Sequence, residues 1–231
     1  EAAFEASWPA AEYAGAGVFR IGRGLGGGRR VSSARALHPG FTPADIDAAL
    51  KIHAGWDQPA IFRVSDGDTA LAEALSARGL QARMPTQMMT APLAALTTLD
   101  VPPVTSFAIW PPLAIQRDLW AGQGIGAARQ AVMARAHGPK TALLGRINDR
   151  AAAVAFAAVS GGIAVFHALE VLPGARRQGL AGWMLREAAF WATRHGAQTM
   201  LLAVTAGNAP AIALYHRLGF TRIAGYRYFQ P

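Results

Sequence analysis

The chain of 231 residues contains no cysteine. Disulfide bonds, cysteine nucleophiles and zinc sites built from cysteine are therefore excluded, and we expect no metal site. The chain also lacks a long apolar run. Its longest charge-free stretch, residues 151–166, is short for a membrane span and is broken by Ser160, Gly161 and Gly162. Two buried strands joined by a tight turn explain this stretch better, so we expect no membrane partner.

Lysine is scarce, because Lys51 and Lys140 are the only two, and arginine carries nearly all the positive charge behind the net charge of +8. A basic balance favours anionic partners, such as nucleic acid or a phosphorylated cofactor. The arginines occur singly or in pairs and never in a run of five or more, which is not typical of nucleic-acid-binding segments. We therefore favour a phosphorylated cofactor over nucleic acid.

The composition is that of a folded protein, since 52% of the residues are hydrophobic. The length allows one large domain or two small ones. The first fifteen residues include acidic side chains and no basic segment, which is not typical of a secretory signal. We expect a bacterial-type cytoplasmic protein.

A turn-rich stretch at 92–106, which holds the adjacent Pro102 and Pro103, indicates a linker between domains at 1–100 and 104–231. After it, strands and helices are mixed, which predicts a mixed α/β sheet. Helical patterns cover one or two helices at 111–137 and single helices at 179–196 and 208–219. Apolar runs predict strands at 104–110, 140–147, 151–161, 162–172 and 198–204, and a closing strand pair at 220–229.

Residues 174–182 read GARRQGLAG and lie where a strand pattern ends and a helical pattern begins. A loop that enters a helix N-terminus presents unpaired N–H groups and the positive end of the helix dipole, which together suit an anion. Gly179 allows close approach of a phosphate to the backbone, and Arg176 and Arg177 add charge at the rim. The alternative is a solvated arginine pair at an ordinary strand–helix turn.

The segment EVLPGARRQGLAGWML (170–185) resembles the acetyl-CoA loop of the GCN5-related N-acetyltransferase (GNAT) family. The family pattern of Arg or Gln, two residues, Gly, one residue, and Gly or Ala is met by Arg176, Gly179 and Ala181. NAPAIALYHRLGF resembles the second half of the family signature, which is met at Asn208, Ala211, Tyr215, Gly219 and Phe220. The resemblance covers residues 104–231 and implies the GNAT fold, acetyl-CoA as cofactor and direct acetyl transfer to an amine.

The resemblance also implies roles for individual residues. Backbone N–H groups of the loop would bind the pyrophosphate, the end of the preceding strand would pair with the pantetheine arm, and Asn208 would hydrogen-bond that arm. The implied cofactor-binding residues are Leu169, Val171, Arg176, Arg177, Gln178, Gly179, Leu180, Ala181, Gly182, Asn208, Ala211 and Tyr215.

Three residues are candidates for acid–base chemistry. Tyr215 would donate a proton to the departing CoA thiolate, which suits a phenol that is protonated at neutral pH. Glu170 and His167 lie on the strand before the loop, where the family often keeps its base, and HALEV resembles the HALAV segment of arylalkylamine acetyltransferases. Ideal alternation points these two side chains to opposite faces unless a bulge intervenes, and we favour Glu170 over His167. Positioning alone, with water taking the proton, stays open as an alternative.

The first half of the chain resembles a degenerate copy of the second. Residues 64–80 align with 204–220 without a gap, so that Asp68 matches Asn208 and Gly79 matches Gly219, each pair 140 positions apart. In this alignment Leu75 corresponds to Tyr215. The region that corresponds to the phosphate loop, near 31–39, lacks the arginine-x-x-glycine spacing. The first half therefore resembles the degenerate half of tandem GNAT proteins, and we expect one active site. Some actinobacterial and proteobacterial tandem members share an early Trp-Pro, here Trp8-Pro9, and a closing Tyr-x-Tyr, here Tyr226 and Tyr228.

The stretch GRGLGGGRR at 22–30 meets the dinucleotide glycine pattern at Gly22, Gly24 and Gly27. No helical pattern follows it, and residues 29–37 read as a strand, so a glycine-rich hairpin explains it better.

The acceptor is a small-molecule or peptide amine that the sequence does not name. Candidates for its pocket are Trp8, Arg20, Trp110, Trp120 and Tyr226. Two other functions compete with acetyl transfer. One is a catalytically silent sensor that binds acyl-CoA, and the other is an arginine-based nucleic-acid-binding protein.

Overall fold

A computed structural model describes all 231 residues. They form two compact units, each built from three separate segments of the chain. Unit 1 comprises Glu1–Trp8, Met88–Val204 and Ala209–Ile223, and unit 2 comprises Pro9–Gln87, Thr205–Asn208 and Ala224–Pro231. This division differs from the boundary expected at residues 100–104. The first eight residues belong with the second half of the chain, and the last eight belong with the first half.

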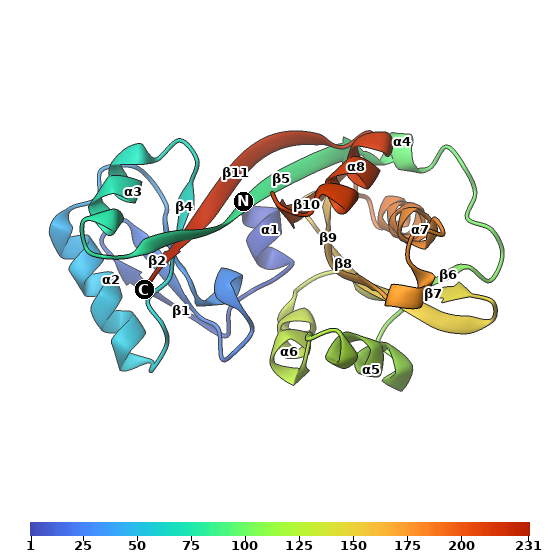
Figure 1. The fold of residues 1–231 in the computed structure, drawn as a ribbon, viewed down its shortest axis with the longest axis horizontal. Coiled ribbons are helices and arrows are strands. Elements are labelled where there is room, and N and C mark those ends of the chain that lie inside the picture. The colour runs from blue at the N-terminus through green and yellow to red at the C-terminus, as the bar shows by residue number, and fades with distance from the viewer. The chain divides into compact units, whose positions relative to one another are not determined.

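Unit 1 is built on a mixed sheet with the strand order β5-β10-β9-β8-β7-β6 (Figure 1). β9 and β10 are parallel, whereas β6, β7, β8 and β9 pair antiparallel in succession. The strands are β5 (Gln81–Pro92), β6 (Ser106–Ile109), β7 (Lys140–Ile147), β8 (Arg150–Ser160), β9 (Ile163–Val171) and β10 (Thr199–Thr205). The helices are α1 (Ala2–Ala6), α4 (Leu93–Leu96), α5 (Ala114–Gly122), α6 (Ala127–Arg135), α7 (Leu180–Arg194) and α8 (Ala209–Arg217).

The core of unit 1 lies between the sheet and α7. Alternate residues of β8, namely Ala153, Ala155 and Ala157, are fully buried against this helix. Their small side chains let the helix approach closely, and a Cβ added to Gly145 of β7 would lie 2.7 Å from Sδ of Met184. The other face of β8 and β9 contacts α1 and α5. Side chains on β8 therefore alternate between a face of alanines that packs against α7 and an opposite face. His167 and Glu170 of the neighbouring β9 are paired with Phe156 and Val154, which point to that opposite face.

Unit 2 has the strand order β1-β2-β3-β4-β11-β5. Its core packs α2 and α3 against one face of this sheet, with Ile46 and Leu71 among the buried helix residues and Ile21 and Phe62 among the buried strand residues. The elements are β1 (Glu12–Ala16), β2 (Phe19–Arg23), β3 (Ala34–Ala36), α2 (Pro43–Gly55), β4 (Phe62–Ser65), α3 (Thr69–Ser76) and β11 (Thr221–Gln230).

The two aligned segments share one succession of elements. β4–α3–β5 corresponds to β10–α8–β11, and the helix starts, Thr69 and Ala209, lie 140 positions apart, as do the strand starts, Gln81 and Thr221. In unit 2 the strand beside β4 is β11, and in unit 1 the strand beside β10 is β5. Each segment thus contributes its last strand to the sheet of the other unit, an arrangement that we call the strand exchange.

Three expectations from the sequence need correction. The closing segment is one long strand, β11, because it continues past Gly225, whose carbonyl accepts a hydrogen bond from Asp66 N (3.0 Å). Residues 93–96, expected as part of a linker, form α4, whose Leu93 and Leu96 are buried in the core of unit 1. Residues 29–37, expected as a strand, form a 3-10 helix at Arg29–Ser32 and then the short β3.

The other expected elements of the second half are present. The stretch 111–137 forms two helices, α5 and α6. In the first half, the glycine-rich stretch at 22–30 connects β2 to β3, and these two strands pair antiparallel. No helix is both long enough and apolar enough to cross a membrane.

Candidate active site

The candidate site is built around the C-terminal half of β9. β9 pairs with β10 from Ile163 to Phe166, opposite Thr199 to Leu202, and then continues for five more residues while its pairing with β8 goes on to Val171. Strand β9 thus has one edge that β10 leaves open from His167 onward. An extended ligand can add to such an edge through backbone hydrogen bonds. Leu169 and Val171 lie on this open edge, where the pantetheine arm was expected.

A β-bulge in this segment decides which way the candidate bases point. His167 is paired with Phe156 of β8, and Glu170 with Val154, so three steps on β9 match two on β8. Ala168 takes the left-handed conformation, with φ +52°, and its carbonyl accepts a hydrogen bond from Nε1 of Trp120 (2.9 Å). Since Phe156 and Val154 share one face of β8, the bulge brings His167 and Glu170 to the same face.

His167 is enclosed in this structure. Its exposed fraction is 6%, and its ring centroid lies 5.0 Å from that of Trp8 and 5.9 Å from that of Phe4. Its Nε2 lies 2.8 Å from Oγ of Ser7, a hydroxyl that also donates to the Phe4 carbonyl (3.1 Å). We call residues 4–8 the N-terminal arm. Phe4, Ser7 and Trp8 of this arm fix the ring of His167, and bulk solvent has little access to the ring.

Glu170 is half-buried, three residues along the same face. Burial raises the pKa of its carboxyl above the ordinary value of 4.5, and the positive charges of Arg176 and Arg129 oppose the shift. A carboxylate with a raised pKa is a better proton acceptor than an exposed one. Glu170 thus combines partial exposure with enhanced basicity, whereas His167 is sealed among aromatic rings.

Tyr215 lies on α8 and is buried, with its ring 5.7 Å from that of Phe220. Burial raises the pKa of its phenol to about 12, and the negative charge of Glu170 contributes to the rise. Ala211, one turn earlier, packs against the core of unit 1, and Asn208 directly precedes the helix.

The glycine–arginine loop connects β9 to α7. Gly179 is the N-cap residue of α7, with φ +82°, and no side chain caps this helix end. Arg177 also has positive φ (+65°), while Nε of Arg176 donates to the Val171 carbonyl (3.0 Å) and Nε2 of Gln178 donates to that of Gly174 (3.1 Å).

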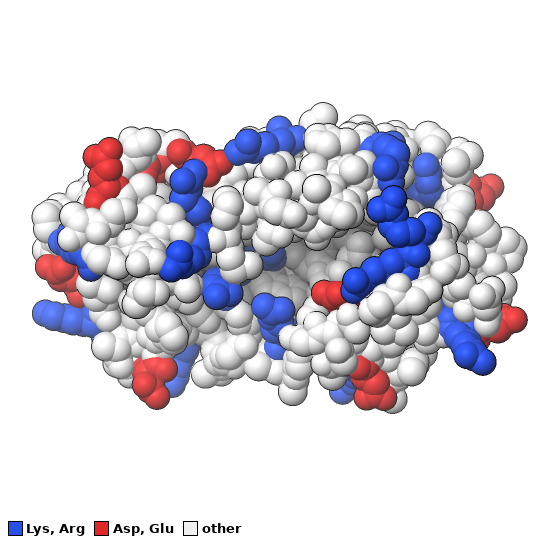
Figure 2. All heavy atoms as spheres, in the orientation of Figure 1, with Lys and Arg blue, Asp and Glu red and all other residues white.

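The first turn of α7 contains no acidic residue, and residues 176–179 are exposed. Leu180 is buried beneath the turn, and a Cβ on Gly182 would come within 3.8 Å of Leu214, so α7 and α8 pack closely here. Figure 2 shows a band of basic side chains over the part of unit 1 that Figure 1 labels α7 and α8. An uncapped helix N-terminus, exposed loop residues and neighbouring arginines fit a pyrophosphate.

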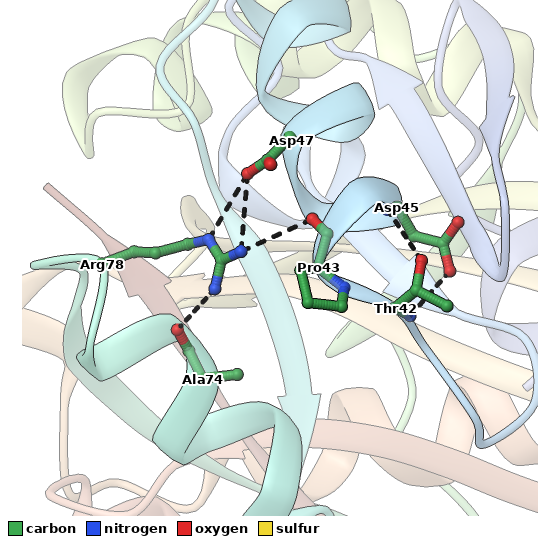
Figure 3. Close-up of polar contacts among 6 residues, drawn as sticks. All are labelled: Thr42, Pro43, Asp45, Asp47, Ala74 and Arg78. Carbon is green, nitrogen blue, oxygen red and sulfur yellow. Dashed lines mark hydrogen bonds and ion pairs between the residues drawn. The ribbon is translucent and has the colours of Figure 1, made fainter.

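In unit 2, α2 lies between β3 and β4 as α7 lies between β9 and β10, and the N-terminus of α2 is capped. At the start of α2, Asp45 N donates to Oγ1 of Thr42 (3.3 Å), and Thr42 N donates to Oδ2 of Asp45 (2.8 Å), as Figure 3 shows. Pro43 has no N–H, and its carbonyl accepts from Nη2 of Arg78 (3.4 Å). The capping box thus occupies the N–H group of Asp45, and the Asp45 carboxylate would repel a phosphate. Unit 2 therefore lacks an equivalent anion site at α2.

The residues proposed for the acceptor pocket differ in exposure. Trp8, Trp120 and Tyr226 are buried, Trp110 is 37% exposed, and Arg20 is exposed. Sequence reasoning missed Ser7 and Phe4 as neighbours of His167, and Arg129 as a charge near Glu170. No local pattern marks them, because each comes from a segment far from β9 in the sequence.

Comparison with known proteins finds a match to one family model. Residues 112–220 match the model of the acetyltransferase (GNAT) family. This segment is similar to the GNAT family, and the mixed α/β fold of the chain matches that of GNAT structures.

Two solved structures show the same fold. A GCN5-related N-acetyltransferase from Kribbella flavida is 23% identical, with a TM-score of 0.66, over 96% of this chain and 89% of that chain. A tandem GNAT protein from the clavulanic acid biosynthesis pathway is 15% identical, with a TM-score of 0.61, over 92% of this chain and 73% of that chain.

One curated relative aligns over a short segment. Streptothricin acetyltransferase from Streptomyces lavendulae is 46% identical over 52 residues, which are 22% of this chain and 28% of that protein. The alignment thus spans little more than a quarter of the relative. No group of three or more His, Cys, Asp or Glu side chains is arranged to hold a metal ion.

Replacing Gly179 with alanine tests the loop. An L-residue at φ +82° costs about 1–2 kcal/mol, and the new Cβ would project where a phosphate must approach the backbone. We expect the Kd for acetyl-CoA, measured by calorimetry, to rise at least about tenfold, equivalent to about 1.4 kcal/mol.

Gly196→Ala is the matched control, because Gly196 lies just beyond the other end of α7 with φ +79° and nothing within 4 Å of an added Cβ. It should cost similar stability and leave binding unchanged. Equal binding by both variants would contradict the assignment of the loop.

Proposed function

We propose that the protein is an acetyl-CoA-dependent N-acetyltransferase that transfers the acetyl group directly to an amine of a small molecule or peptide. The observation that carries the proposal is the open edge of β9, which leads past Glu170 to the exposed, uncapped N-terminus of α7. The negative charge of Glu170 also acts on the Tyr215 phenol. GNAT enzymes use acetyl-CoA, and the loop from Arg176 to Ala181 fits its pyrophosphate.

Acetyl-CoA supplies the acetyl group as a thioester, and its transfer forms a C–N bond while the C–S bond breaks. Glu170 accepts the proton that the acceptor amine must lose. Tyr215 donates its phenolic proton to the sulfur of the leaving thiolate and regains a proton from solvent. His167 is held by Ser7 and the aromatic rings, and it acts as a positioning residue for the bulged segment of β9 that carries Glu170.

Glu170→Gln tests the proposed base and keeps the shape of the side chain. We expect kcat/KM at neutral pH to fall about 10²-fold, at the low end of general base effects because water can reach a half-buried position. In the wild type, activity should rise with pH as the carboxyl loses its proton. Because burial raises its pKa, this limb should lie above 4.5, and it should vanish in the variant.

Glu187→Gln is the matched control for this experiment. Burial also raises the pKa of Glu187, which lies on α7 and pairs with Arg194 (3.9 Å). This variant should keep both the rate and the acidic limb. If Glu170→Gln retains full activity with an unchanged pH profile, water or another group takes the proton.

An acceptor screen that measures CoA release tests the function as a whole. The panel should contain amino acids, peptides with free N-termini and amine antibiotics, with streptothricin among them because of the aligned relative. Turnover with any acceptor supports the proposal. Tight acetyl-CoA binding without turnover across the panel would favour the silent sensor.

A further inference from the structure

Trp183 lies at the rim of the glycine–arginine loop, outside the residues implied for acetyl-CoA binding. It is the fourth residue of α7, after Leu180, Ala181 and Gly182. The family pattern ends at Ala181 and does not extend to this position. Because the three residues before it are apolar or lack a side chain, the indole N–H of Trp183 is the only polar side-chain group in the first turn of this helix.

The indole of Trp183 lies beside Gly179, the N-cap residue of α7. Side chains of an α-helix lean towards its N-terminus, so a residue covers the position about four places before it. A Cβ added to Gly179 would lie 3.8 Å from Nε1 of Trp183. Apart from chain neighbours and the helix backbone, no other heavy atom lies within 4 Å of that point. The space beside Gly179 is therefore bordered by one hydrogen-bond donor and is otherwise open.

The indole N–H of Trp183 donates no hydrogen bond to another protein group, although the residue is half-buried. An indole N–H that is partly removed from water normally has a partner, because an unsatisfied donor costs free energy. Two neighbouring side chains bind the backbone of the loop itself. Nε of Arg176 donates to the Val171 carbonyl (3.0 Å), and Nε2 of Gln178 donates to the Gly174 carbonyl (3.1 Å). Trp183 thus keeps a side-chain donor for a ligand at Gly179.

Arg186, one turn further along α7, holds the indole ring in place. Its guanidinium carbon lies 6.0 Å from the centroid of the Trp183 ring, within the range of a cation–π contact. Nη1 of Arg186 donates to the Leu96 carbonyl (2.8 Å) and to Oγ1 of Thr98 (3.2 Å), so the guanidinium is tied to the end of α4. The ring is therefore oriented before a ligand binds, and little side-chain entropy is lost on binding.

We propose that the indole N–H of Trp183 donates a hydrogen bond to a pyrophosphate oxygen of acetyl-CoA. The inference rests on the proposed function, because it requires that the loop holds a pyrophosphate. A hydrogen bond to a charged oxygen is stronger than one to a neutral acceptor, so one indole N–H changes the affinity measurably. The contact is made with the pyrophosphate and not with the acetyl group, so Trp183 acts in cofactor binding and not in catalysis.

Replacing Trp183 with phenylalanine tests the inference, because it keeps an aromatic ring beside Gly179 and removes the N–H donor. We expect the Kd for CoA, measured by calorimetry, to rise about tenfold. 3′-Dephospho-CoA keeps the pyrophosphate and lacks the 3′-phosphate, so its Kd should rise by the same factor. Trp183 is not among the buried residues of the unit 1 core, so the melting temperature without ligand should change little.

Trp56→Phe is the matched control for this experiment. Trp56 is also half-buried and also has an arginine beside its ring, with the guanidinium carbon of Arg23 5.9 Å from the ring centroid. It lies in unit 2, at the C-terminal end of α2. This variant should leave the Kd values for both ligands unchanged.

Tryptophan fluorescence gives a second measurement that a purely structural role would not affect. The emission of an indole responds to hydrogen bonding and to charge at its N–H group. Saturation with CoA should therefore change the emission of the wild type. Most of this change should be lost in Trp183→Phe and kept in Trp56→Phe.

The possible results separate this inference from the proposed function. If the wild type binds CoA and Trp183→Phe binds it with the same Kd, the inference is overturned and the proposed function stands. A loss of affinity for CoA that is absent for 3′-dephospho-CoA would also overturn the inference, because it would place the indole at the 3′-phosphate. If the wild type binds neither ligand, the proposed function fails and the inference fails with it.

Discussion

Replacing Tyr215 with phenylalanine should lower kcat about 10³-fold, within the 10²–10⁴ range of general acid catalysis. Tyr215 is 7% exposed, so water has little access to replace the hydroxyl as the proton donor when it is removed. This effect should exceed that of Glu170→Gln, where the side chain is half-buried and solvent can substitute for it.

Binding and pH dependence distinguish an acid catalyst from a structural tyrosine. The ring of Tyr215 packs against Phe220, and phenylalanine preserves that contact, so the Kd for acetyl-CoA and the melting temperature should change little. Since the pKa of Tyr215 is raised to about 12, the phenol stays protonated as the pH rises through the neutral and moderately alkaline range. The wild type should therefore show no loss of rate from Tyr215 below about pH 11.

Wild-type activity in Tyr215→Phe would contradict the assignment. So would a loss of rate that is matched by an equal loss of acetyl-CoA affinity, because that result would mean a binding role.

A fragment that begins at the expected boundary, residues 104–231, should fail to fold. Met89, Leu93 and Leu96 are buried in the core of unit 1 but precede this boundary. Each buried side chain of this size contributes about 1.5–3 kcal/mol, and together they approach the whole stability of a domain, about 5–15 kcal/mol.

The fragment also loses backbone partners. Leu93 N donates to the Gln198 carbonyl (2.9 Å), and Oγ1 of Thr90 donates to that of Met200 (3.0 Å), so β10 loses its outer neighbour β5. The arm that holds His167 is missing as well. Circular dichroism and thermal unfolding should therefore show no cooperative transition.

Expression of residues 1–103 together with 104–231 is the control. The cut falls between α4 and β6 and leaves every strand intact, so the two pieces should assemble and bind acetyl-CoA. Cooperative unfolding and acetyl-CoA binding by 104–231 alone would show that the strand exchange is dispensable for unit 1.

The local features of the site could be predicted from the sequence. The end of β9, the loop and the start of α7 lie within one residue of their predicted places, because Pro173, Gly174 and Gly179 mark them directly. These boundaries depend on residues that are adjacent in the sequence, so they can be predicted without knowledge of tertiary contacts. Roles assigned to individual residues in this segment stay predictions.

The features that depend on distant contacts could not be predicted. The bulge at Ala168 has no turn residue to mark it, since its partners are Phe156 and Val154 on β8 and Trp120 on α5. The strand exchange depends on which sheet β5 and β11 join. In β11, pairing with β4 overrides the turn tendency of Gly225.

The central claim is a single live acetyl-CoA site, formed by the loop before α7. Calorimetric titration of the purified 231-residue chain with acetyl-CoA tests it most directly. The account predicts one site per chain, because α7 has an uncapped N-terminus, whereas Thr42 and Asp45 close that of α2. Two sites per chain would contradict the reading of unit 2, and no binding would contradict the proposed function itself.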